Sequence, residues 1–177
     1  MLRLGHIDEE LDTLPRETLI ELVKMYSRNW HTVDGLWFRG VEQRFGIDVA
    51  LEIDIEMWKS MSKTEAKRIK EILSIGERGG VEAVLRTVHF MSWAPASGYE
   101  IERNGDSALL TCTKCPPQEA RIQKGIGEFA CRPTFEYGFQ NVADVIDPRV
   151  KVTCLICPPG PHPPDLWCRW EFRITPP

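Results

Sequence analysis

The chain has 177 residues, enough for one domain with a sizeable core, and 27% of them are charged and 42% apolar, as in a typical globular protein. The formal net charge is −4 and basic residues are interspersed with acidic ones, so a nucleic acid is not an expected partner. The beginning of the chain has no apolar signal-peptide core, and no stretch is long and apolar enough to span a bilayer. We therefore predict a cytoplasmic protein without a membrane segment.

The first 97 residues have the apolar periodicity of helices. Their main feature is a stripe that recurs every three or four residues and predicts one long helix between Pro15 and Gly46. A stripe of this length must be covered by the rest of the protein or by another chain. The protein also has six tryptophans, and aromatic residues are enriched at interfaces, so we expect a self-associating surface and a homodimer. The stripe consists of Leu19, Leu22, Val23, Tyr26, Trp30, Val33, Trp37, Val41 and Phe45.

Three further helices are predicted in this half. Asp48 is expected to cap the second, and the sequence from Ser62 to Glu65 has the form of a capping box that opens a third. The fourth follows Gly80 and has apolar residues at helical spacing through Val88.

The apolar period changes to two near residue 98. Asn104-Gly105 predicts a tight hairpin between the first two strands. The predicted order is ββααββ, with strands at 99–103, 108–114, 149–156 and 166–174 and helices at 118–129 and 133–145. We therefore predict a single α+β domain over residues 1–177, with a helical half (1–97) packed on a mainly antiparallel four-stranded sheet in a cysteine-rich half (98–177).

All six cysteines lie in the second half, two pairs of them in Cys-x-x-Cys-Pro-Pro units. Such spacing can place two sulfurs on one zinc ion, but residues three apart in a continuous strand point to opposite faces. Ligands from the ends of different strands are the better prediction, because the stiff loop 158–164 would hold those ends at a fixed separation. The predicted zinc ligands are Cys115, Cys131, Cys157 and Cys168, with His162 as a substitute.

Cys112 and Cys154 lie in the middle of predicted strands, and core packing is favoured for them, although a ligand role stays open. The alternative for the other four cysteines is that they too are buried as small apolar side chains. The test of the metal hypothesis is whether the sulfurs of Cys157, Cys168 and one of Cys115 or Cys131 converge.

A second group of candidates could bind a small ligand. His31 and Asp34 are one turn apart on the long helix, and Asp34 shares the apolar stripe, where a carboxylate must be paired or have a shifted pKa. The alternative is a helix break at Gly35 with Asp34 as a cap. Arg121 and Arg132 could hold a ligand carboxylate through a planar guanidinium, the alternative being an exposed, solvated position.

The second half also resembles known families. The segment Cys115-Pro-Pro-Gln-Glu-Ala-Arg121, then Cys131, then Cys168-Arg-Trp-Glu-Phe172, resembles the aminothiazoline carboxylate hydrolases. The spacing from Cys154 to Cys168 and Phe172 is similar to that of vinyl reductase-like domains, which belong to a ligand-binding superfamily with Golgi-transport and nitric-oxide-signalling modules. The resemblance implies an α+β fold with a small-molecule or metal pocket between sheet and helices, often in a dimer.

Two functions are therefore expected. The first is a binding domain, with a sensory role as one form of it, whose cysteine-rich pocket holds zinc or a small ligand. The alternative is a hydrolase that opens a C–N or C–S bond of a small heterocycle, with Cys131 or Cys168 as nucleophile or metal ligand. A third possibility is a structural protein whose cysteines belong to the core.

Overall fold

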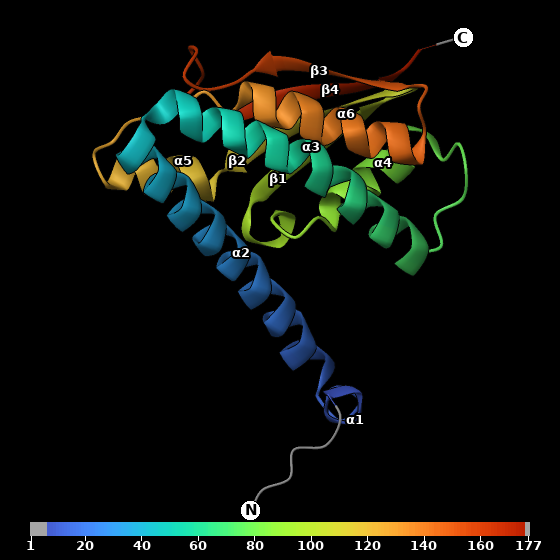
Figure 1. The fold of residues 1–177 in the computed structure, drawn as a ribbon. Helices are drawn as coiled ribbons and strands as arrows, with labels where there is room; N and C mark the ends of the chain where they lie inside the picture. The colour runs from blue at the N-terminus through green and yellow to red at the C-terminus, as the bar shows by residue number, and fades with distance from the viewer. Residues whose placement is uncertain (1–6, 176–177) are drawn as a thin grey trace, which may run out of the picture.

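The computed structural model describes residues 7–175 and has the predicted α+β class (Figure 1). Helices precede the sheet, and the second half has the predicted ββααββ order. The elements are α1 (Ile7–Leu11), α2 (Arg16–Phe45), α3 (Ile47–Ile72), α4 (Gly80–His89), the short 3-10 helix η1 (Ala94–Ala96), β1 (Gly98–Asn104), β2 (Ser107–Lys114), α5 (Pro116–Gln123), α6 (Arg132–Ile146), β3 (Val150–Ile156) and β4 (Cys168–Ile174).

The long helix α2 is continuous through Gly35, so the alternative in which Asp34 caps a new helix after a break is wrong. It begins directly after Pro15, a residue whose fixed φ suits a helix start. It ends at Gly46, whose φ of 90° is a conformation that other residues rarely adopt. Because α3 starts at the next residue, α2 and α3 meet in a sharp corner and their facing sides come together.

Helix α3 is longer than predicted, and the expected capping box at Ser62 to Glu65 is wrong. The Ser62 hydroxyl instead donates to the carbonyl of Trp58 inside the helix, at 2.6 Å. The Glu65 carboxylate accepts from the backbone N–H of Ser92 at 2.6 Å. Neither hydrogen bond requires a helix end, and the second carboxylate oxygen of Glu65, Oε2, is buried without a hydrogen-bond partner among the described residues. Asp48 lies in the first turn of α3, which Gly46 precedes, and makes no capping hydrogen bond.

The four strands form one antiparallel sheet in the order β1-β2-β4-β3. The predicted hairpin is confirmed, with Asn104 opposite Ser107 and a φ of 56° at Gly105. Strand β4 lies in the centre of the sheet, where its Cys168 faces Cys112 of β2. The end of β2, the end of β3 and the start of β4 therefore meet at one end of the sheet, which brings the cysteines together.

Helix α6 packs along α3 and against β3, and α4 lies beside it (Figure 1). The resulting core combines both halves of the chain, because side chains of α3 and α4 lie in the same buried cluster as those of α6 and the sheet. Helix α5 is shorter than predicted and ends at Gln123. Among the described residues, no helix has the length and apolar character that crossing a membrane requires. The fully buried centre includes Val84, Val88, Met91, Leu110, Val142, Ile146, Trp170 and Phe172.

Candidate functional site

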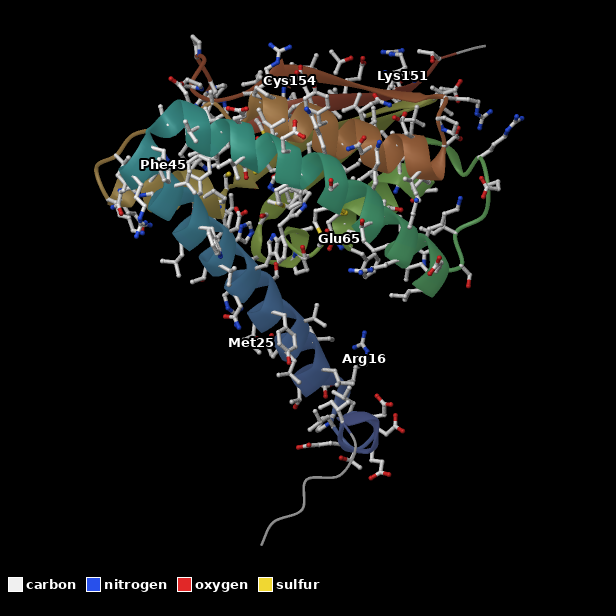
Figure 2. All side chains as sticks on the ribbon, viewed as in Figure 1. Arg16, Met25, Phe45, Glu65, Lys151 and Cys154 are labelled. Atoms are coloured by element: carbon white, nitrogen blue, oxygen red, sulfur yellow. The ribbon has the colours of Figure 1, made fainter. Side chains whose placement is uncertain are left out.

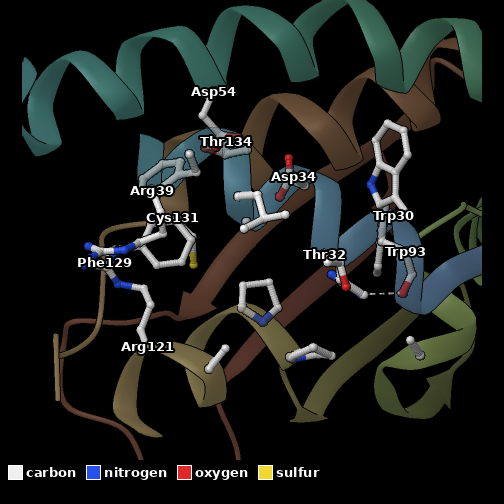
Figure 3. Close-up of a pocket in the computed structure, with 18 of the residues that line it drawn as sticks. Trp30, Thr32, Asp34, Arg39, Asp54, Trp93, Arg121, Phe129, Cys131 and Thr134 are labelled. Atoms are coloured by element: carbon white, nitrogen blue, oxygen red, sulfur yellow. Dashed lines mark hydrogen bonds between the residues drawn. The ribbon is translucent and has the colours of Figure 1, made fainter. Parts of the chain in front are cut away.

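A cavity of about 830 Å³ lies where α2, α3, η1, α5 and α6 meet (Figure 3). Its volume lies within the range of small-molecule sites, and its lining combines apolar and aromatic side chains with eleven polar ones, five of which are Lys or Arg. Four residues predicted from the sequence line it, although the sequence assigned them to two separate sites. These are His31, Asp34, Arg121 and Cys131.

The cavity has aromatic walls. Trp30 of α2 and Trp58 of α3 meet edge to face, with ring centroids 6.0 Å apart. Trp93, just before η1, packs edge-on against Phe135 of α6 at 5.7 Å. The indole N–H of Trp30 is buried and has no hydrogen-bond acceptor within the described part of the chain. A ligand with an acceptor atom would satisfy it.

Two carboxyl groups, from Asp34 on α2 and Asp54 on α3, lie on the same side of this cavity (Figure 3). Asp54 accepts a hydrogen bond from the hydroxyl of Thr134 at 2.8 Å. Asp34, by contrast, has no hydrogen-bond or ion-pair partner among residues 7–175. A partly buried carboxyl without a partner is unfavourable when ionised, so this group is open to a ligand.

Burial, reinforced by the negative charge of Asp54, raises the pKa of Asp34 to about 7. Burial also raises the pKa of Asp54, to about 6, against the opposing effect of hydrogen bonds from Thr134 and Trp58. Asp34 is therefore close to half protonated at neutral pH. A carboxyl in this state can exchange a proton with a bound molecule or bind a cation.

Asp54 was not predicted, although the sequence contains a signal for it. It lies four residues after Ala50 and four before Trp58, which are both buried, so helical spacing places it on the inward face of α3. A carboxylate on such a face requires the same explanation as Asp34. Its hydrogen-bond partner Thr134 is 80 residues away, and no local pattern indicates it.

His31 holds one wall of the cavity in place. Its Nε2 lies 2.9 Å from the carbonyl oxygen of Trp93, shown as a dashed line in Figure 3. Burial lowers the pKa of His31, partly opposed by this carbonyl, so the neutral ring with the proton on Nε2 donates to Trp93. The predicted ligand residue thus also positions the Trp93 indole.

Arg121 and Arg132 have different surroundings. Arg121 is buried and its guanidinium makes two hydrogen bonds to the Glu42 carboxylate, at 2.9 and 3.1 Å, and one to the carbonyl of Gly127 at 3.0 Å. Hydrogen bonding to Arg121 is the main reason why the pKa of Glu42 is lowered. Arg132 is exposed, pairs with Glu136 at 2.8 Å and lies outside the cavity lining. Arg121 is therefore a structural tie at the edge of the cavity.

The six cysteines are all free thiols, and five of them form two neighbouring groups. The sixth, Cys154, is partly buried against the core, and its thiol donates to the carbonyl of Ile156 at 3.6 Å. In the first group, the sulfurs of Cys131 and Cys157 are 3.7 Å apart. This contact, together with burial, raises the pKa of Cys157. In the second, hydrogen bonding with Cys115 and Cys168 raises the pKa of Cys112, and hydrogen bonding with Cys112 lowers the pKa of Cys168. The predicted ligands are thus divided, with Cys131 and Cys157 in one group and Cys115 and Cys168 in the other.

His162 is turned toward Glu128, with Nε2 3.2 Å from the carboxylate. Its Nδ1 lies 3.0 Å from the carbonyl of Pro163, and this contact is the main reason why the pKa of His162 is raised. Within residues 7–175, no group of three or more His, Cys, Asp or Glu side chains is arranged to hold a metal ion. Cys112 is 2% exposed and Cys131 5%, so both also pack as core side chains.

Comparison with known proteins gives one match. The sequence model of a family described as a family of unknown function (DUF6125) matches residues 12–174. No curated protein and no solved structure matches the chain. The matched region includes the whole cavity lining and all six cysteines.

Proposed function

We propose that this chain, which belongs to the family of unknown function DUF6125, binds a small organic ligand in the cavity between α2, α3, α5 and α6. The observation that carries the proposal is Asp34, a partly buried carboxyl that lines an 830 Å³ cavity and has no partner in the described part of the chain. The six cysteines of the chain are all free thiols, which is typical of proteins in a reducing compartment. We therefore infer a cytoplasmic location.

The chemistry of the lining selects a class of ligand. A protonated nitrogen next to Asp34 would offset the cost of ionising this carboxyl and would also favour the charged form of Asp54. The indoles of Trp30 and Trp58 offer faces and edges to a flat cation, and the free N–H of Trp30 offers a donor to an acceptor atom. The expected ligand is a small, flat molecule with a basic nitrogen and a hydrogen-bond acceptor.

Matched pairs of probes test this proposal. Benzamidine and benzamide have nearly the same shape, but only benzamidine is cationic at neutral pH. We expect benzamidine to bind measurably by calorimetry at pH 8 and benzamide to bind at least tenfold more weakly. Asp34→Asn should weaken binding of benzamidine about tenfold, since it removes a partly buried charge pair. Asp165→Asn, a change of an exposed residue, is the control. Equal binding of both probes, or unchanged binding to Asp34→Asn, would contradict the proposal.

A zinc site at the cysteines is a second candidate, favoured by the sulfur separation of 3.7 Å between Cys131 and Cys157. Two thiolates 2.3 Å from one tetrahedral zinc lie about 3.8 Å apart. Cys157 follows Ile156, which pairs with Arg169, so Cys168 at the start of β4 lies at the neighbouring strand end. Completing four ligands would require rotation of the side chain of Cys168, Cys115 or His162.

Elemental analysis of protein purified without oxygen or nickel resin tests the zinc site. We expect one zinc per chain, and less zinc together with lower stability in Cys157→Ser and Cys168→Ser, because metal binding is coupled to folding. His89→Ala, at the end of α4, is the control. Absence of zinc from the wild-type protein, or full zinc content in both serine variants, would contradict the proposal.

A hydrolase acting on a C–N or C–S bond of a small heterocycle remains the alternative for the same cavity. Asp34 and the Cys131 thiol both line this cavity, which favours the hydrolase. The pKa of Asp34, about 7, suits proton transfer at neutral pH. Loss of the absorbance of an aminothiazoline carboxylate in the presence of the protein would support it. If the protein binds the compound but does not convert it, the result would contradict the hydrolase and would be consistent with the binding function.

A further inference from the structure

The N-terminal part of the molecule forms an arm. Helix α1 and the first turns of α2 extend away from the body, and their side chains project into solvent (Figures 1 and 2). Within residues 7–175, the first α2 residue with a hydrogen bond to another element is Ser27, whose hydroxyl accepts from the backbone N–H of Ala96 at 3.1 Å. The first turns of α2 continue a helix whose later part packs on the body, so the arm is held out from the body as a helix. Its exposed surface is therefore available to a partner.

One face of α2 carries the exposed apolar side chains. Trp37 is 74% exposed, Tyr26 64% and Val23 56%, and their spacing places them on the same side of the helix. Val33 and Phe45, which are also more than half exposed, continue this face toward the body. A groove at its body end is lined by Leu36, Trp37, Gly40, Val41, Arg44 and Phe45. A contiguous apolar surface of this kind marks an interaction site.

The two ends of this face have opposite charge. At the tip of the arm, α1 carries Glu9 and Glu10 beside Ile7 and Leu11, which are exposed. At the groove end, Arg44 is exposed and its guanidinium donates only to the carbonyl of Gly40, at 2.8 Å, within the described part of the chain. An acidic, apolar tip at one end and an apolar groove with an arginine at the other complement each other when two copies run antiparallel.

We propose that two copies of the chain form a dimer in which the α2 faces pack antiparallel and α1 of each copy lies against the groove from Leu36 to Phe45 of the other. A twofold axis makes both contacts at once, so the interface is closed. Helix α2 has 30 residues and is about 45 Å long, which allows the arm of one copy to reach the body of the other. Antiparallel helix dipoles add to the attraction between the charged ends.

Sedimentation equilibrium of the full chain tests the dimer. We expect the wild-type protein to be dimeric at 10 µM and Trp37→Asp to be monomeric at the same concentration, with far-UV circular dichroism and thermal unfolding showing that the body is folded. Ile72→Asp is the matched control, because Ile72 is 80% exposed but lies at the end of α3, away from the arm. Wild-type protein that is monomeric at 100 µM, or equal effects of the two substitutions, would overturn the proposal.

Charge reversal tests the direction of pairing. Arg44→Glu should weaken dimerisation about tenfold at low salt, and the double variant Glu9→Arg, Glu10→Arg should weaken it similarly. Combining all three changes should restore wild-type affinity, because each acidic groove would then face a basic α1. In a parallel pair, Arg44 would face its own symmetry copy and the combined variant would stay weak. If the combined variant does not regain the wild-type dimerisation affinity, the antiparallel arrangement is wrong.

Discussion

At the scale of single residues, Asp34 links the chemistry of the cavity to the stability of the fold. Its pKa rises from 3.8 to about 7, so the folded protein holds this proton more tightly than the unfolded chain does. The free energy of unfolding therefore falls as the pH rises from about 4 to about 7, and this loss is complete above pH 7. Asp54 adds a loss of the same sign up to a pH of about 6.

Asp34→Asn should remove most of this pH dependence. We expect the variant to match the wild-type protein at pH 4 and to be more stable by about 2 kcal/mol at pH 8, because the amide carries no buried charge. Urea denaturation at pH 4, 6 and 8 measures the difference. Asp165→Asn should keep the wild-type profile. An Asp34→Asn profile as steep as that of the wild-type protein would show that Asp34 is ionised at little cost.

At the scale of elements, the ion pair between Arg121 and Glu42 fixes α5 to α2 and thereby sets one wall of the cavity. The side chains are 9% and 14% exposed, so removing Arg121 leaves a largely buried carboxylate with only Arg39 as an ion-pair partner within residues 7–175. Arg121→Met should lower the free energy of unfolding by about 3 kcal/mol. The change Arg103→Met, which breaks the exposed pair with Glu82, should cost less than about 1 kcal/mol.

Urea denaturation measures the stability of these two variants and of the double variant Arg121→Met, Glu42→Gln. The double variant shows how much of the loss in Arg121→Met comes from the Glu42 carboxylate that stays buried. The double variant should regain part of the lost stability, because it removes the Glu42 carboxylate, which in Arg121→Met keeps only Arg39, at 2.7 Å, as an ion-pair partner among the described residues. If Arg121→Met and Arg103→Met lower the free energy of unfolding by the same small amount, the ion pair between α5 and α2 does not stabilise the fold as its burial indicates.

At the scale of the whole molecule, we expect the helical half and the cysteine-rich half to unfold together. The core is shared, since Ala66 of α3 and Val84 of α4 lie in the same buried cluster as Phe139 of α6 and Trp170 of β4. Tryptophan fluorescence and far-UV circular dichroism should give coincident urea transitions. The isolated fragment 98–177 should not fold, because it would expose the face of α6 that packs on α3. Two separate transitions, or a folded fragment, would contradict this expectation.

Much of the fold was predictable from the sequence because its signals are local. The glycine at the end of α2, the Asn104-Gly105 turn and the period-two pattern of β3 and β4 each depend on a few adjacent residues, and each indicated the element that forms. The error at Ser62 has a physical cause. The same polar side chains that end a helix also form hydrogen bonds inside it or to distant loops, and only the folded chain decides between these.

The candidate site divides in the same way. The sequence by itself determined that Asp34 would be a carboxyl on an apolar helix face and that the cysteines would gather in the second half, because residue type and helical or strand spacing fix these facts. Only the tertiary structure decided which groups meet. Glu42 and Arg121 are 79 positions apart and Cys131 and Cys157 are 26 apart, and Asp34 meets Asp54 only because α2 and α3 fold back at Gly46. Contacts of this kind depend on the packing of whole elements, for which one sequence has no local signal.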